Sequence, residues 1–127
     1  VLSFYDKHRE KDCALINQWP SEIKMEGWFI RLRKGGYQTT HIHPAAWISG
    51  CVYLKTVEPG EALEGGIKFS LYGYEYPILD ENYPSKILSP KRGDIVIFPS
   101  DLFHSTIPFV KGDERCVIAF DVIGQPG

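Results

Sequence analysis

The sequence lacks the features that mark membrane proteins and nucleic-acid-binding proteins. Its apolar runs, such as residues 95–98, have the length of a strand and fall far short of the roughly 20 residues of a membrane-spanning helix. Basic residues are not in excess, because 14 Lys and Arg against 16 Asp and Glu give a net charge of −2. We therefore expect neither a membrane nor a nucleic acid as a partner.

Cysteine is scarce as well. The three cysteines, Cys13, Cys51 and Cys116, cannot all pair, and a chain of 127 residues can bury a core without disulfides. Cys51 and Cys116 lie within apolar runs, where a small buried side chain is expected rather than a reactive thiol. These features favour a reducing compartment, and we expect a cytoplasmic protein.

Length and composition predict a single folded domain over residues 1–127. Apolar residues make up 43% of the chain and charged residues 24%, close to the averages of folded domains. Residues 1–26 are expected to form a helical or irregular segment, with one weakly amphipathic helix over residues 7–18 that ends before Trp19 and Pro20. Residues 27–127 are expected to form a β core.

The β core is predicted from short runs of β-branched and aromatic residues separated by Gly, Pro, Asn and Asp. The predicted strands cover residues 28–33, 37–43, 47–55, 66–71, 85–88, 94–98, 103–108 and 115–122. Several of these runs are apolar on both faces, as expected where both faces of a sheet are covered. The pattern predicts a mainly β fold, a jelly roll or a barrel, with the helix packed outside.

Three of the four histidines could bind a metal ion together. His41 and His43 are two residues apart, so on a strand they would share a face with Cβ atoms about 6–7 Å apart. Such a pair is competent to bind metal, but it also occurs on solvated strand faces. His104 begins another predicted strand, which a barrel could place opposite the pair, whereas His8 lies among charged residues and is expected to be solvated.

Arg115 opens the last apolar strand, where its guanidinium needs a partner. The planar fork of arginine suits a carboxylate bound through two hydrogen bonds. The charge pattern favours an ion pair with Asp113, Glu114 or Asp94, and a bound ligand carboxylate is the alternative.

Ordered motifs along the chain carry a family resemblance. They are RKGGYQTTHIHP at residues 33–44, WISGCVYL at 47–54 and GDIVIFPS at 93–100, followed by His104, Pro108 and Arg115. This set, over residues 27–122, resembles the 2-oxoglutarate- and Fe(II)-dependent oxygenases, in the branch with a His-x-His-Pro motif that often accompanies tetratricopeptide repeats. The resemblance implies a double-stranded β-helix, a jelly-roll or cupin-like fold, with one or more N-terminal helices outside it.

The resemblance also implies roles for individual residues. His41 and His104 match the family's metal-binding histidines, and Arg115 matches the arginine that binds the distal carboxylate of 2-oxoglutarate. The family generally has Asp or Glu two residues after the first histidine, whereas this chain has His43 there and no acidic residue from 31 to 57. We expect His43 to be the third metal ligand, and the alternative is that His43 turns away and water takes its place.

Three polar side chains near the histidine pair, Tyr37, Ser49 and Tyr53, are candidates for binding the cosubstrate or for hydrogen bonds behind the ligands. The implied cofactors are Fe(II), 2-oxoglutarate and O₂. The implied activity is that of a dioxygenase that couples decarboxylation of 2-oxoglutarate to oxidation of a C–H bond in a small molecule or a side chain.

The missing carboxylate leaves two alternatives open. One is a catalytically silent cupin-type domain that binds metal or senses a ligand, and the other is a three-histidine dioxygenase that does not use 2-oxoglutarate. Arg115 at the expected position favours use of 2-oxoglutarate. A homodimer is a further expectation, since exposed edges of a jelly roll often pair.

Overall fold

The computed structural model describes residues 2–125, which form two short helices followed by seven strands. The helices are α1 (Leu2–His8) and α2 (Ala14–Asn17). The strands are β1 (Glu22–Arg33), β2 (Ile48–Lys55), β3 (Ile67–Ser70), β4 (Ser85–Leu88), β5 (Ile95–Pro99), β6 (Phe103–Thr106) and β7 (Glu114–Gln125). No helix of these residues is long and apolar enough to cross a membrane.

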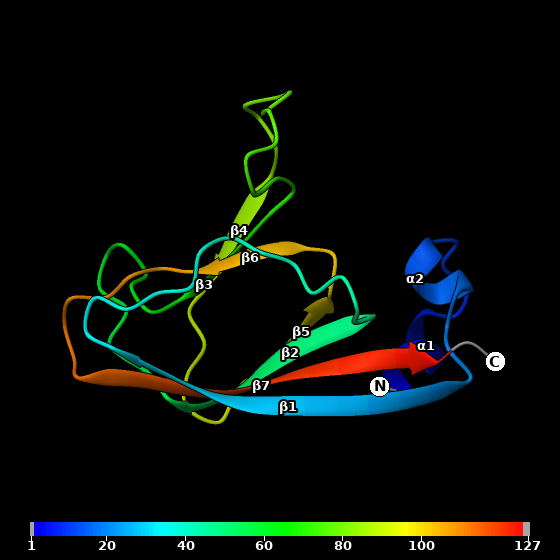
Figure 1. The fold of residues 1–127 in the computed structure, drawn as a ribbon, viewed down its shortest axis with the longest axis horizontal. Coiled ribbons are helices and arrows are strands. Elements are labelled where there is room, and N and C mark those ends of the chain that lie inside the picture. The colour runs from blue at the N-terminus through cyan, green and yellow to red at the C-terminus, as the bar shows by residue number, and fades with distance from the viewer. Residues whose placement is uncertain (1, 126–127) are drawn as a thin grey trace.

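The strands form two antiparallel sheets that lie one above the other (Figure 1). The larger sheet has the order β1-β7-β2-β5, and the smaller has the order β4-β3-β6. Sequence neighbours such as β1 and β2 are separated in the larger sheet by β7, the last strand of the chain. This crossing of the chain between two facing sheets confirms the predicted double-stranded β-helix.

The segment from residue 37 to 43 runs beside β6 but is not a strand, so that prediction is wrong. His41 and His104 exchange both backbone hydrogen bonds as an isolated bridge. Two residues further on, the backbone N–H of His43 donates to the carbonyl of Ser100 outside β6, so the ladder does not continue. A regular strand needs a succession of such pairs with one neighbour.

The helix predicted over residues 7–18 is wrong over most of its length, because α1 lies mainly before it and only the four-residue α2 falls inside it. α1 ends at His8 and α2 begins at Ala14, after Cys13 in an extended conformation. The four residues from 9 to 12 are all charged and exposed. They offer no apolar face whose burial could stabilise a continuous helix. The helices do lie outside the sheets, as expected (Figure 1).

β1 begins at Glu22, six residues before the predicted strand. It pairs along its whole length with β7, from Glu22 opposite Gln125 to Arg33 opposite Glu114. Its first residues are exposed and show no alternation of buried and exposed side chains, so the sequence pattern did not reveal them. β1 thus runs across the boundary that was placed after residue 26.

The core between the sheets holds one histidine in place. Phe69 and Phe98 pack edge to face with ring centroids 5.0 Å apart, and together with Ile67 they form a buried cluster. The ring of His104 lies 4.6 Å from that of Phe98 and is itself 6% exposed. Apolar packing therefore fixes the position of His104 before any ligand is considered.

Candidate metal centre

Three imidazole rings converge between the sheets. His41 and His43 come from the segment beside β6, and His104 comes from β6 itself. One nitrogen of each ring lies within 4.8 Å of one nitrogen of the other two. The centroid of the His41 ring is 4.3 Å from that of His104 and 5.2 Å from that of His43. The structure therefore brings together the three histidines that the sequence singled out, although His104 lies beside His41 rather than opposite it.

The backbone orients two of these rings. The Nδ1 atom of His41 lies 2.6 Å from the carbonyl oxygen of Thr39, and that of His104 lies 2.9 Å from the carbonyl oxygen of Leu102. Because a carbonyl only accepts, each Nδ1 must carry the proton and donate it. The Nε2 lone pair of each ring is then free. Burial lowers the pKa of His104 to about 4, which keeps the imidazole neutral at physiological pH.

A carboxylate orients the third ring. The Nδ1 atom of His43 lies 2.7 Å from Oδ1 of Asp121 on β7. Ser49 on β2 donates its hydroxyl hydrogen to the same oxygen at 2.6 Å. Sequence reasoning did not find Asp121, and the available signal was a single acidic residue within the otherwise apolar run of residues 116–123. Here too the Nδ1–H faces an acceptor and Nε2 is free.

This donor set fits a divalent transition metal. Three neutral imidazoles with their Nε2 atoms free are suitable ligands for iron, zinc, copper or nickel. Each ring is also held from behind through Nδ1, the arrangement that usually accompanies histidine ligands in metal sites. We expected His41 and His43 to converge because they would share one face of a strand, but their segment does not form a strand. They converge through the irregular course of their segment.

Arg115 lies on β7 and lines the same cavity as the three histidines. It is 2% exposed. Its Nε donates to the carbonyl of Gly65 at 2.9 Å, and Nη2 donates to the hydroxyl of Tyr53 at 3.3 Å. Burial raises the pKa of Tyr53 to about 12, so the phenol stays protonated and can donate its own hydrogen to a ligand.

The ion pair that the charge pattern favoured for Arg115 does not form. Among residues 2–125, no carboxylate lies within ion-pair distance of its guanidinium. Glu114 pairs instead with Arg31 and Lys55 on the outer side, and Asp94 binds the backbone of a neighbouring turn. A buried cation without a counter-ion is costly. The cavity is therefore suited to an anionic ligand.

The three polar candidates near the histidine pair occupy different positions. Tyr37 is 55% exposed and is not among the residues that line the cavity. Ser49 is fully buried and takes the second of the two roles expected for it, since its hydroxyl donates to Asp121 behind His43. Tyr53 is not among the lining residues either, but it is the one of the three candidates whose hydroxyl contacts Arg115.

A protein-family model described as "Putative 2OG-Fe(II) oxygenase" matches residues 26–121. The chain belongs to this family. The match spans β1 to β7 and includes all three histidines and Arg115. No curated protein sequence matches the chain.

Solved structures of oxygenases share the fold of this family member. A 2OG-Fe(II) oxygenase family oxidoreductase from Burkholderia pseudomallei has 16% identity and a TM-score of 0.61, with 88% of this chain and 50% of that chain covered. A Pseudomonas putida prolyl-4-hydroxylase has 17% identity and a TM-score of 0.59, with coverages of 80% and 52%. HygX from Streptomyces hygroscopicus, solved with nickel and 2-oxoglutarate, has 15% identity and a TM-score of 0.62, with coverages of 81% and 58%. The chain thus spans about half the length of the first two.

Proposed function

We propose that this chain is an Fe(II)- and 2-oxoglutarate-dependent dioxygenase. The observation that carries the proposal is one cavity that contains three inward-facing imidazoles and a buried guanidinium without a counter-ion. A divalent metal and a dicarboxylate together would satisfy both features. In addition, the family to which the chain belongs is described by this chemistry.

The metal ligands in this proposal are His41, His43 and His104, each through Nε2. These three residues would hold the ion and leave it accessible to further ligands. Bound Fe(II) supplies an O₂-dependent oxidation in which 2-oxoglutarate is converted to succinate and CO₂ while a C–H bond of the substrate is oxidised.

Arg115 and Tyr53 would bind the distal carboxylate of 2-oxoglutarate. The guanidinium contributes charge and a planar array of donors, and the Tyr53 hydroxyl accepts from Nη2 and can donate its own hydrogen. Their role is to orient the cosubstrate relative to the histidines. The apolar side chains of Trp28, Ile67 and Phe98 line the same cavity and would exclude water.

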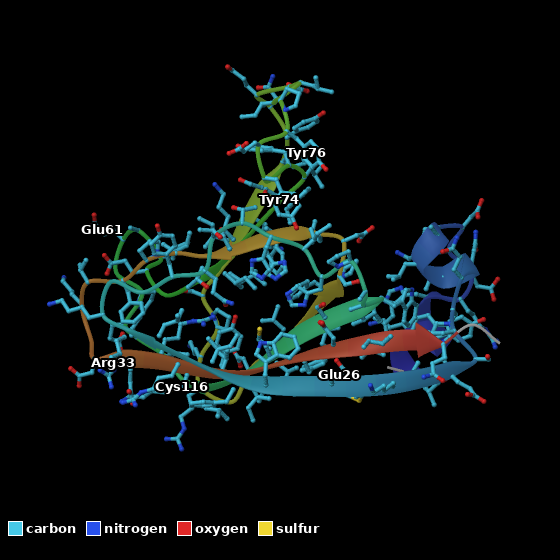
Figure 2. All side chains as sticks on the ribbon, viewed as in Figure 1. Glu26, Arg33, Glu61, Tyr74, Tyr76 and Cys116 are labelled. Atoms are coloured by element: carbon cyan, nitrogen blue, oxygen red, sulfur yellow. The ribbon has the colours of Figure 1, made fainter. Side chains whose placement is uncertain are left out.

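The substrate class is a small molecule or a side chain. Residues 71–84 connect β3 to β4 and project away from the sheets, with Tyr74 and Tyr76 along the projection (Figures 1 and 2). The Tyr74 ring packs edge to face on Phe103, the neighbour of His104, with centroids 5.3 Å apart. This aromatic projection is where we expect a substrate to make its outer contacts.

The cysteines, the net charge and the sheet edges indicate the compartment and the partners that we propose for the enzyme. Three free cysteines favour a reducing compartment, and we propose the cytoplasm. A net charge of −2 argues against a nucleic-acid partner. An edge strand of the larger sheet, such as β1, is where a homodimer would form by strand pairing.

The experiment is an anaerobic titration of the Fe(II)-loaded protein with 2-oxoglutarate. We expect a visible metal-to-ligand charge-transfer band that requires both components, followed by succinate formation when O₂ is admitted. His104→Ala, which removes a proposed ligand, should abolish the band. Binding of Fe(II) without any band or succinate would contradict the proposal.

A second candidate function is a metal-binding domain without turnover. It is favoured by His43, because a neutral imidazole stands where the family generally has a carboxylate. In the same titration, this candidate predicts metal binding with neither the charge-transfer band nor succinate. O₂ consumption that does not require 2-oxoglutarate would instead indicate a three-histidine dioxygenase.

A further inference from the structure

Asp121 is a mostly buried carboxylate without a cationic partner among residues 2–125 other than an imidazole. Its side chain is 16% exposed. Its polar contacts are the Nδ1 atom of His43 at 2.7 Å and the Ser49 hydroxyl at 2.6 Å. No Lys or Arg of the described chain lies within ion-pair distance. Because burying a charge is costly unless an opposite charge balances it, this carboxylate requires a positive charge nearby.

The three imidazoles differ in the group that holds each Nδ1. His41 and His104 donate to neutral backbone carbonyls, of Thr39 and Leu102. His43 alone faces an acidic side chain. A carboxylate behind a histidine fixes the tautomer and makes the other ring nitrogen a stronger donor to metal. His43 is therefore the ligand through which negative charge can reach the metal.

We propose that Asp121 is a positioning residue that acts through His43 and supplies the negative charge missing from the ligand set. Three neutral imidazoles bring no negative charge of their own to a divalent ion. The carboxylate would lie one imidazole further out, on β7. The inference rests on the proposed metal binding by the three histidines, and it requires neither turnover nor 2-oxoglutarate.

The fold holds Asp121 in the orientation this role needs. Asp121 is paired in register with Ser49 across β7 and β2, so their side chains lie on the same face of the sheet. Ser49 is fully buried and donates to Oδ1, the oxygen that His43 also approaches. Two donors at one oxygen restrict the carboxylate to a single rotamer. The hydroxyl thereby keeps the lone pair of Oδ1 directed at the His43 ring.

The test is the metal affinity of Asp121→Asn, measured anaerobically with Fe(II) and separately with Co(II) against a chromophoric chelator. The amide retains an acceptor oxygen and the size of the side chain but removes the charge. We expect affinity to fall roughly 10- to 100-fold, the usual cost of losing a partner behind a histidine ligand. The ligand-field absorption of bound Co(II) should shift as well.

Glu26→Gln is the matched control. Glu26 is the register partner of Asp121 on β1, and it is 51% exposed and paired with Lys24. The variant removes the same charge close to the site without touching His43. Its metal affinity should stay within about 3-fold of wild type, as expected for an exposed charge. A loss as large as that of Asp121→Asn would show a general effect of net charge and overturn the proposal.

A double-mutant cycle with His43→Ala separates action through His43 from a merely structural role. If Asp121 acts through this ring, Asp121→Asn should cost no further affinity once His43 is replaced. An equal loss in both backgrounds would contradict the inference, as would unchanged affinity in the single variant. Should Asp121→Asn not fold, Ser49→Ala tests the same idea, with a smaller loss expected and an unchanged affinity counting against it. Wild-type protein that binds metal but forms no succinate would contradict only the proposed function.

Discussion

Replacement of Arg115 by methionine tests whether the uncompensated guanidinium binds the cosubstrate. Arg115 is 2% exposed, lines the histidine cavity and pairs with no carboxylate among residues 2–125. Methionine retains much of the side-chain volume but removes the charge and the donors. We expect Arg115→Met to lose the thermal stabilisation that 2-oxoglutarate gives to the metal-loaded protein.

The size of the effect follows from linkage. A ligand at 100 times its Kd stabilises the folded state by about 2.7 kcal/mol. For a domain of this size that corresponds to a rise in Tm of roughly 8–13 °C. Removing one partner of a buried, hydrogen-bonded charge pair costs about 2–5 kcal/mol, or roughly 30- to 5,000-fold in Kd. At the same concentration the variant should then gain less than about 1 kcal/mol.

The assay is thermal unfolding of the Ni(II)-loaded protein with and without 2-oxoglutarate, since a metal that supports no turnover keeps the ligand intact. Arg31→Met is the control, because Arg31 lies on the outer side and pairs with Glu114. It should retain the full shift in Tm. A 2-oxoglutarate-dependent shift in Arg115→Met as large as in wild type would refute the role given to Arg115.

Two further predictions concern the stability of the fold. Phe109 is 0% exposed, so Phe109→Ala should lower the free energy of unfolding by about 3–5 kcal/mol in urea denaturation, and a loss below about 1 kcal/mol would show that it is not a core residue. Burial raises the pKa of Tyr53 to about 12, above the ordinary value of 10.0 that applies in the unfolded chain. The unfolded state therefore loses its proton first, and stability should fall as pH rises from about 10 to about 12. Tyr53→Phe should show a shallower loss and lack the last step of the ultraviolet tyrosinate titration, and identical profiles for both proteins would contradict the burial argument.

The predicted strand bounds are accurate to about one residue where a run is apolar and bounded by turn residues. β2 begins one residue after the predicted start, and β5 is displaced by one residue from its predicted bounds. In these segments the side chains that face the core are the residues that favour strands, so local pattern and tertiary packing agree. The first residues of β1 are exposed, and only their pairing with β7 makes them a strand. A pattern-based prediction has no access to such a partner.

In the candidate site, too, the sequence pattern identified residues, whereas their contacts depended on the tertiary structure. The spacing of His41 and His43 and the family resemblance pointed to the histidines, although the geometry assumed for them was that of a regular strand. The ion pair assumed for Arg115 did not form, because Glu114 points to the opposite side of the sheet from its sequence neighbour. Asp121 gave no signal beyond its isolation among apolar residues.

The sequence by itself determined the class of fold, the approximate strands and the residue types able to bind a metal and a carboxylate, because side-chain periodicity and donor chemistry are local properties. Only the tertiary structure decided which charges are paired. Cross-strand register places Asp121 beside Ser49 and behind His43, and it leaves Arg115 facing the histidine cavity without a counter-ion. Those contacts join residues more than 50 positions apart, and the closing of two sheets on each other creates them.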